Sequence, residues 1–328
     1  MSKYSMEENR EYKYATKQIE HFLKQNSKIL SITSSPFNSL SIFKEAINDI
    51  SLNNKKLLYI TNNKKKLREL LDGTLAKTLK LKYAYTEDSK TNIICLDFEE
   101  AKAINEEYDL TIIDDISTIN QTNQIKTLVD IIYNDSKKII VYSIEKISLE
   151  KTLEICDINN PIPILEPRIM TTRIDLTKDI PFSLYEYLKW FNSRNRNVII
   201  LVPDVNIYVD IIKKYVDKFN LKDIKIIYDL KQTTKINFQK DKSVFIITKD
   251  IVENITEIKN LDIVMLGLDK NIYSYKTIVY LSSIVANNSK EQGEILLIAN
   301  TISKDMELAK NIVRNYNKLL WQKGLLNY

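Results

Sequence analysis

Glycine is the residue that this chain of 328 residues most conspicuously lacks. Only four glycines occur, Gly73, Gly267, Gly293 and Gly324, and each stands alone. They make up about 1% of the chain, where roughly 7% is usual. The phosphate-binding pattern G-x-x-x-x-G-K-[ST] cannot be written with isolated glycines. The sequence therefore excludes a standard glycine-rich phosphate loop.

Cysteines and long apolar runs are also scarce. Cys95 and Cys156 lie in apolar surroundings without a C-x-x-C pair, so we expect small buried residues rather than disulfides or a zinc site. No apolar run approaches the roughly 18 residues that would span a bilayer, and the N-terminus has no apolar signal region. We expect a soluble protein in the cytoplasm, either free or peripheral at the inner face of the membrane.

Positive charge exceeds negative charge only slightly. The 48 Lys and Arg residues against 43 Asp and Glu residues give a net charge of +5. This balance permits a polyanionic partner without requiring one. Arginine is rare, and none lies between residues 197 and 313.

Apolar runs alternate with amphipathic segments along the whole chain. Runs without internal alternation are typical of parallel strands that are buried on both faces. Between them lie segments with apolar residues at helical spacing, such as IFKEAINDI and NQIKTLVDIIYN. The expected strands are KILSIT, KLLYIT, NIICLDF, YDLTIIDDI and KIIVYSI in residues 28–144, and NVIILVP, IKIIYDL, SVFIITK, LDIVMLGL and GEILLIAN in residues 197–300.

These two series predict two α/β lobes, each a mostly parallel sheet flanked by helices. Four of the six prolines fall within NPIPILEPRIMTTRIDLTKDIP, which is poorly suited to a long helix. We therefore expect a first lobe at residues 1–157, a linker at 158–180 and a second lobe at 181–328. Ligands of open α/β sheets bind at the carboxyl ends of strands, so the cleft between the lobes is the expected site.

The order of these segments resembles superfamily-2 helicases, and most closely the ComFA-like competence proteins that drive single-stranded DNA into bacteria. The segment SVFIITKDIVENITEIKNLDIVMLGLD is similar to that family's strand, E-R-G-[IV] element and V-x-V-[IV]-L-G-x-D strand. The residues in register are Glu253, Asn260, Leu266, Gly267 and Asp269. The resemblance implies RecA-like lobes, Mg-ATP as cofactor, and single-stranded DNA with DNA-uptake or recombination proteins as partners.

The chain departs from this family at the phosphate loop. Laid on the family's T-G-x-G-K-T loop, the stretch Ser34 to Ser39 replaces both glycines and puts Asn38 at the lysine position. Pro36 removes a further backbone donor. The Ser39 hydroxyl could still reach a magnesium ion. If a nucleotide binds here, we expect Ser35, Asn38 and Ser39 to contact it.

The arginines of the family are replaced as well. Its Q-x-x-G-R-x-G-R element falls on residues 280–287, with Ile284 and Asn287 at the arginine positions, and its E-R-G is Glu253-Asn254-Ile255. Loss of an arginine finger alone can cost roughly 10³ to 10⁵ in rate. We therefore expect negligible ATP hydrolysis. The family's four-cysteine zinc module is missing too.

An acidic pair ends the strand at 108–116. Asp114 and Asp115 occupy the position of the helicase Asp-Glu, where the aspartate holds magnesium and the glutamate positions water. Asp114 could hold the metal, but Asp115 is one methylene short of the second role. The alternative is that both aspartates only end a buried strand and cap the following turn.

Lysine-bearing turns follow two strands where helicase lobes meet the DNA backbone. The alternative for any one of these residues is an ordinary solvated helix start. Tyr273, Tyr275 and Tyr280 have a spacing compatible with base stacking, although a chain with 19 tyrosines produces such spacing often. The candidate nucleic-acid contacts are Thr61, Lys64, Lys65, Lys66, Thr248 and Lys249.

Three functional hypotheses remain from the sequence. The first is a ComFA-like protein with decayed ATPase motifs that binds DNA or protein in an uptake or recombination assembly. The second is a working ATP-dependent DNA translocase with unusual motifs. The third is a two-lobed nucleotide-sugar transferase. Such an enzyme requires a glycine-rich loop in the first lobe and a diphosphate site in the second lobe. The oligomeric state stays open.

Overall fold

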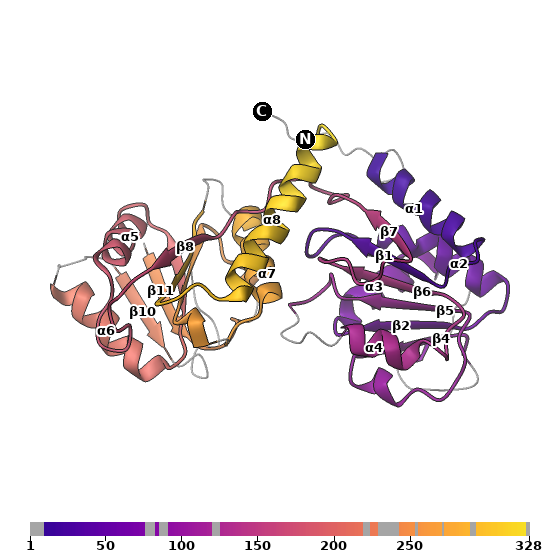
Figure 1. The fold of residues 1–328 in the computed structure, drawn as a ribbon, viewed down its shortest axis with the longest axis horizontal. Coiled ribbons are helices and arrows are strands. Elements are labelled where there is room, and N and C mark those ends of the chain that lie inside the picture. The colour runs from indigo at the N-terminus through magenta and orange to yellow at the C-terminus, as the bar shows by residue number, and fades with distance from the viewer. Residues whose placement is uncertain are drawn as a thin grey trace. The chain divides into compact units, whose positions relative to one another are not determined.

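The computed structural model describes residues 10–75, 83–84, 91–119, 125–218, 224–228, 243–252, 255–270, 272–288 and 293–325. The chain divides into two compact units, Met1–Ile162 with Lys318–Tyr328, and Pro163–Asn317. Each unit holds one parallel β-sheet flanked by helices (Figure 1). The predicted α/β fold with two mostly parallel sheets is confirmed.

The sheet of the first unit has seven strands in the part of the chain that the structure describes, in the order β3-β4-β2-β5-β6-β1-β7. Every neighbouring pair is parallel. The carboxyl ends of all these strands therefore lie at one edge of the sheet. The strands are β1 (Ile29–Thr33), β2 (Leu57–Thr61), β3 (Tyr83–Ala84), β4 (Ile93–Leu96), β5 (Leu110–Asp114), β6 (Ile139–Ser143) and β7 (Lys151–Glu154).

Helices cover both faces of this sheet. On one face, α4 buries Leu128 and Ile132 in a core cluster with Leu58, Ile113 and Val141 of the central strands. On the opposite face, the ring of Phe43 in η2 packs edge-on against strand residues Tyr59 and Tyr142. The helical segments are α1 (Arg10–Leu23), η2 (Leu40–Phe43), α2 (Lys44–Leu52), α3 (Lys64–Leu75), η3 (Glu100–Ala103) and α4 (Ile125–Ile132).

The second unit repeats the plan with a parallel sheet in the order β10-β11-β9-β12-β13-β8. Its strands are β8 (Arg168–Thr171), β9 (Asn197–Leu201), β10 (Ile224–Tyr228), β11 (Ser243–Thr248), β12 (Leu261–Leu266) and β13 (Ile295–Ala299). Its helical segments are α5 (Phe182–Ser193), α6 (Val205–Lys218), η5 (Ile255–Glu257), η6 (Leu268–Lys270), α7 (Tyr275–Asn288) and the first part of α8 (Lys304–Gln322).

Helices α5 and α6 build the main core of this unit. Leu188 and Phe191 of α5 and Ile212 of α6 pack with Ile200 and Phe245 of the sheet. Helix α7 contacts the sheet through β12 outside this cluster and buries nearly its whole circumference. Among the described residues, no helix combines the length and apolarity needed to cross a bilayer.

A buried ion pair joins the amino ends of two strands in the second unit. Arg196, which precedes β9, donates from Nε to Asp262 Oδ2 at 2.6 Å and from Nη2 to Asp262 Oδ1 at 3.0 Å. Arg196 is 2% exposed and Asp262 is fully buried. Gly293 makes room for the pair, since a Cβ there would lie 3.1 Å from Arg196 Nη2 and 2.9 Å from the Leu261 carbonyl oxygen. This pair is part of the scaffold.

We predict that Arg196→Ala lowers the free energy of unfolding by about 3–5 kcal/mol, because it leaves the Asp262 carboxylate buried and unpaired. The double variant Arg196→Met with Asp262→Leu should recover most of that loss, since a buried ion pair and an apolar pair of similar volume differ little in stability. Urea denaturation measures both. Arg168→Ala, which removes the exposed Arg168–Glu294 contact of 3.4 Å, is the control and should cost at most about 1 kcal/mol. A double variant as unstable as Arg196→Ala would contradict this account.

Both cysteines are free and buried, as the sequence predicts. Burial raises the pKa of the Cys95 thiol to about 12 and that of the Cys156 thiol to about 12, from the ordinary value of 9.0. A shift of this size lowers the thiolate fraction at pH 8 by about a thousandfold. We therefore predict that neither thiol reacts with a disulfide reagent at pH 8 until the protein unfolds. Rapid labelling of the native protein, followed by absorbance, would contradict the burial.

Candidate functional site

The candidate nucleotide loop follows β1 at the carboxyl edge of the first sheet. The Ser34 amide donates to the Ser143 carbonyl at 3.0 Å, and the Phe37 amide donates to the Ile116 carbonyl at 2.8 Å. These bonds tie the loop to the ends of β6 and β5, so Ser39 and Asp114 belong to the same sheet edge, as the parallel topology requires. Phe37 has a φ of 59°, a left-handed conformation that costs energy for a bulky residue.

Asn38, at the lysine position of the helicase loop, is fully buried. Its Nδ2 donates to Ser34 Oγ at 2.7 Å and to the Cys156 carbonyl at 3.0 Å. Its Oδ1 accepts from the Ser39 amide at 2.6 Å and from the Ile158 amide at 3.0 Å. The Asn38 side chain therefore fastens the loop to the segment after β7 instead of facing a ligand.

The backbone amides of this loop mostly serve protein acceptors. In addition to the amides of Ser34, Phe37 and Ser39, the Ser41 amide donates to Ser39 Oγ at 3.2 Å. The same Ser39 hydroxyl lies 2.8 Å from Ser41 Oγ, so it caps η2. A phosphate cradle needs several amides that point at the ligand. Here those donors are satisfied inside the protein.

Ser35, the remaining loop residue that the sequence singles out, points toward a carboxylate. Its hydroxyl donates to Asp157 Oδ2 at 3.4 Å. The other oxygen of Asp157 accepts from the amides of Asn159 and Asn160, each at 2.9 Å. Burial raises the pKa of Asp157, and the hydrogen bonds partly offset that effect. A carboxylate beside the loop repels phosphate.

Lys66 also reaches this loop. Its Nζ, carried by α3, donates to the carbonyl oxygens of Phe37 at 3.2 Å and of Asn38 at 3.1 Å. Burial lowers the pKa of Lys66, while the charges of Asp114 and Asp157 act in the opposite direction. The ammonium is thus held against the loop rather than presented to solvent.

Asp114 is the last residue of β5 and is fully buried. Its Oδ1 accepts from the amides of Ile116 and Ser117, both at 3.1 Å. Its Oδ2 accepts from Ser117 Oγ at 2.5 Å and Thr61 Oγ1 at 3.2 Å. Burial raises its pKa, and these hydrogen bonds oppose the rise. The carboxylate therefore caps the turn after the strand. This is the geometry expected if the aspartate only ends the strand and does not hold a metal.

Asp115 is fully buried as well, and it connects two strand ends. Its Oδ2 accepts from the Ser143 hydroxyl at 2.8 Å, while its amide donates to the Tyr142 carbonyl at 2.9 Å. Within the described part of the chain, no group of three or more His, Cys, Asp or Glu side chains is arranged to hold a metal ion.

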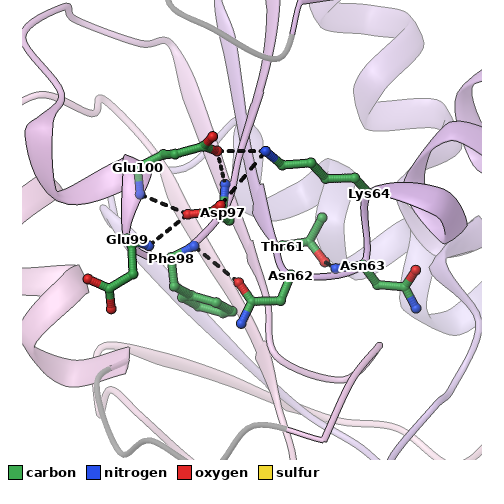
Figure 2. Close-up of polar contacts among 8 residues, drawn as sticks. All are labelled: Thr61, Asn62, Asn63, Lys64, Asp97, Phe98, Glu99 and Glu100. Carbon is green, nitrogen blue, oxygen red and sulfur yellow. Dashed lines mark hydrogen bonds and ion pairs between the residues drawn. The ribbon is translucent and has the colours of Figure 1, made fainter. Parts of the chain in front are cut away.

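The residues of the turn after β2 differ in charge pairing and in exposure, and therefore in their ability to contact a phosphate backbone. Figure 2 shows the Lys64 ammonium between Glu100, at 2.7 Å, and Asp97, at 3.8 Å. The buried Thr61 hydroxyl accepts from the Asn63 amide at 3.1 Å and helps to cap α3. Only Lys65 among the three lysines is exposed. The turn is therefore a mixed-charge surface rather than a purely basic one.

The corresponding turn of the second unit follows β11. The buried Thr248 side chain bonds within its own turn, to the Asp250 carbonyl at 3.0 Å and from the Asp250 amide at 3.1 Å. Lys249 is exposed. Its carbonyl accepts from the Tyr273 hydroxyl at 2.7 Å. The turn therefore presents both Lys249 and the acidic Asp250 to solvent.

The base-stacking hypothesis for three tyrosines is wrong, because all of them are buried. Tyr273 is 5% exposed, Tyr275 is 6% exposed and Tyr280 is fully buried. Of the two positions that replace helicase arginines on α7, Ile284 is buried and Asn287 donates to the Ser283 carbonyl at 2.9 Å. The E-R-G-like residues Glu253 and Asn254 lie outside the described residues.

We predict that Asn38→Ala lowers the free energy of unfolding by about 2–4 kcal/mol, because it leaves several buried donors and acceptors without partners. Asn53→Ala is the matched control. Asn53 is exposed at the end of α2, where its Nδ2 donates to the Asp49 carbonyl at 2.8 Å, and its loss should cost about 0.5 kcal/mol or less. Thermal unfolding followed by circular dichroism compares the two. Equal effects would mean that Asn38 does not hold the loop.

No protein-family model and no curated protein sequence matches this chain. Solved structures do resemble it, and superfamily-2 helicase-type proteins are among them. Xpd4 of S. tokodaii aligns over 95% of this chain and 97% of its own, at 10% identity and a TM-score of 0.54.

Two further structures are similar over nearly the whole of this chain. RecG bound to a three-way DNA junction aligns over 95% of this chain at 12% identity, with a TM-score of 0.49. The E. coli DExH-box NTPase HrpB aligns over 94% at 11% identity, also with a TM-score of 0.49. The chain spans 46% of the RecG chain and 43% of the HrpB chain. The Xpd4 alignment, at 10% identity, shows the fold alone, and that fold is helicase-like with two RecA-like lobes.

Proposed function

We propose that this chain is a ComFA-related, helicase-like protein whose ATPase motifs have decayed, and that it acts as a DNA-binding or assembly component in DNA uptake or recombination. The observation that carries the proposal is the Asn38 amide, which occupies the lysine position and makes four hydrogen bonds inside the protein. A loop fastened in this way has no lysine of its own, and several of the amides that nucleotide phosphates require already donate to protein acceptors.

The rest of the carboxyl edge agrees with this proposal. The Asp114 carboxylate accepts four hydrogen bonds from its own turn and from Thr61, so its oxygens already have donors. On α7, apolar and amide side chains stand where the resemblance would need arginines. What the chain keeps is the two-lobed scaffold, together with exposed Lys65 and Lys249 after the carboxyl ends of strands.

We predict that the purified protein releases no phosphate from Mg-ATP above background, with or without single-stranded DNA. Asn38→Lys alone should not create activity, since Pro36 and Phe37 still obstruct the backbone cradle and the arginine positions stay empty. A steady-state phosphate-release assay tests both proteins. A turnover near the roughly 1–10³ s⁻¹ of ordinary enzymes would contradict the proposal and favour a working translocase.

We predict that binding to single-stranded DNA is weak, electrostatic and indifferent to ATP. Each phosphate contact to a single strand contributes about −0.7 to the slope of log affinity against log salt. Lys65→Ala should therefore flatten the slope by up to about 0.7. Lys64→Ala should change it less, because Glu100 and Asp97 already neutralise that ammonium.

A salt titration of fluorescent oligonucleotide binding measures these slopes. The sequence alone allows a change of about 2 if all three lysines at 64–66 touch DNA. We expect the largest single effect from Lys65, because it is the exposed lysine of the three. Equal flattening by Lys64→Ala and Lys65→Ala would contradict this assignment. No binding at low salt would favour a purely protein-binding role, and tight binding switched by ATP would favour the translocase.

A further inference from the structure

The loop after β1 presents oxygen atoms to a cation. The carbonyls of Phe37 and Asn38 both accept from Lys66 Nζ, at 3.2 and 3.1 Å. Asp157 approaches the same loop through its contact with Ser35. Carbonyl and carboxylate oxygens are ligands of cations, whereas phosphate needs N–H donors. The polarity of this loop is therefore opposite to that of a phosphate site.

The cation is the side-chain ammonium of Lys66, which is carried by the neighbouring helix α3 of the same unit. Lys66 lies in the first turn of α3, and its own amide donates to the Asn63 side chain at 3.0 Å, which fixes the start of the helix. Asn63 Nδ2 in turn donates to the Ser117 carbonyl, at 3.1 Å, in the turn that Asp114 caps. The base of the Lys66 side chain is thus held in place beside the loop.

We propose that the loop after β1 is a cation site whose built-in ligand is the Lys66 ammonium. This inference rests on the proposed function and deepens it. The loop that would bind phosphate in a helicase instead binds a cation here, and that cation is a side chain of the same protein. A relocated lysine that serves phosphate is the opposing explanation. The Phe37 and Asn38 carbonyls argue against it, because a phosphate bound to the Lys66 ammonium would lie next to these two oxygens.

Chemical rescue tests the site. Lys66→Ala removes the ammonium and leaves the two carbonyls without their donor, so it should lower the melting temperature. Ethylammonium chloride should then raise the melting temperature of Lys66→Ala saturably, as mass action requires of a bound ligand, and by more than it raises that of the wild type. Tetramethylammonium at the same concentration has no N–H donor and should not do so. Lys65→Ala, from the exposed neighbour, should show no ethylammonium-specific rise.

Amine labelling of the wild-type protein tests the site without a variant. Acylation with a water-soluble reagent, read by mass spectrometry, should be slower at Lys66 than at Lys65 by about tenfold or more, because the half-buried Lys66 ammonium donates to two carbonyls whereas Lys65 is exposed. Equal rates at the two lysines would overturn the inference, as would equal responses of wild type and Lys66→Ala to ethylammonium. Nucleotide binding by the wild type that disappears in Lys66→Ala would establish the relocated lysine instead.

These outcomes separate the two proposals. If the wild type shows no ATP turnover but Lys66 labels as fast as Lys65, the proposed function stands and the cation site fails. If the wild type hydrolyses ATP, the proposed function itself fails, whatever the labelling shows.

Discussion

The hydrogen bonds of the buried Asn38 amide are the constraint on which the account of this molecule depends. A primary amide has two donors and an oxygen with two lone pairs, and Asn38 satisfies Ser34, Ser39, Cys156 and Ile158 with them. A lysine at the same place would bring an unpaired ammonium into a fully buried position. The loop and the segment after β7 are therefore built around a neutral side chain. Replacing Asn38 with lysine would remove its hydrogen bonds and lower the stability of the fold.

Other polar side chains along the carboxyl edge of the first sheet also bond to groups within the protein. Asp114 caps its own turn, Asp115 binds Ser143, and Lys64 pairs with acidic residues. In an enzyme, such groups are kept available for metal, water or phosphate, at a cost in stability. Here they mostly stabilise turns and strand ends. The first unit thus has a helicase-like fold whose polar groups at the carboxyl edge mostly bond within the protein.

Much of the fold was predictable from the sequence, and less of the site. The ten expected strands all exist, because strands buried on both faces leave continuous apolar runs. The sequence did not predict β3, β7 and β8, because these edge strands are only two to four residues long, and β8 lies inside the proline-rich stretch. The role of Lys66 was not predictable either. Which of three consecutive lysines turns toward a loop depends on how α3 packs, and adjacent helix positions differ by about 100° in direction. The position of Asp157 beside the loop was not predictable, because no sequence motif includes this residue.

The central claim is that the loop after β1 does not accept a nucleotide, and equilibrium binding tests it more directly than any rate. The measurement is isothermal titration calorimetry of the wild-type protein with Mg-ATP. The account predicts no saturable heat at millimolar nucleotide. Saturable binding with a micromolar Kd that is lost in Ser39→Ala would contradict it, because it would show that the loop still holds phosphate and magnesium.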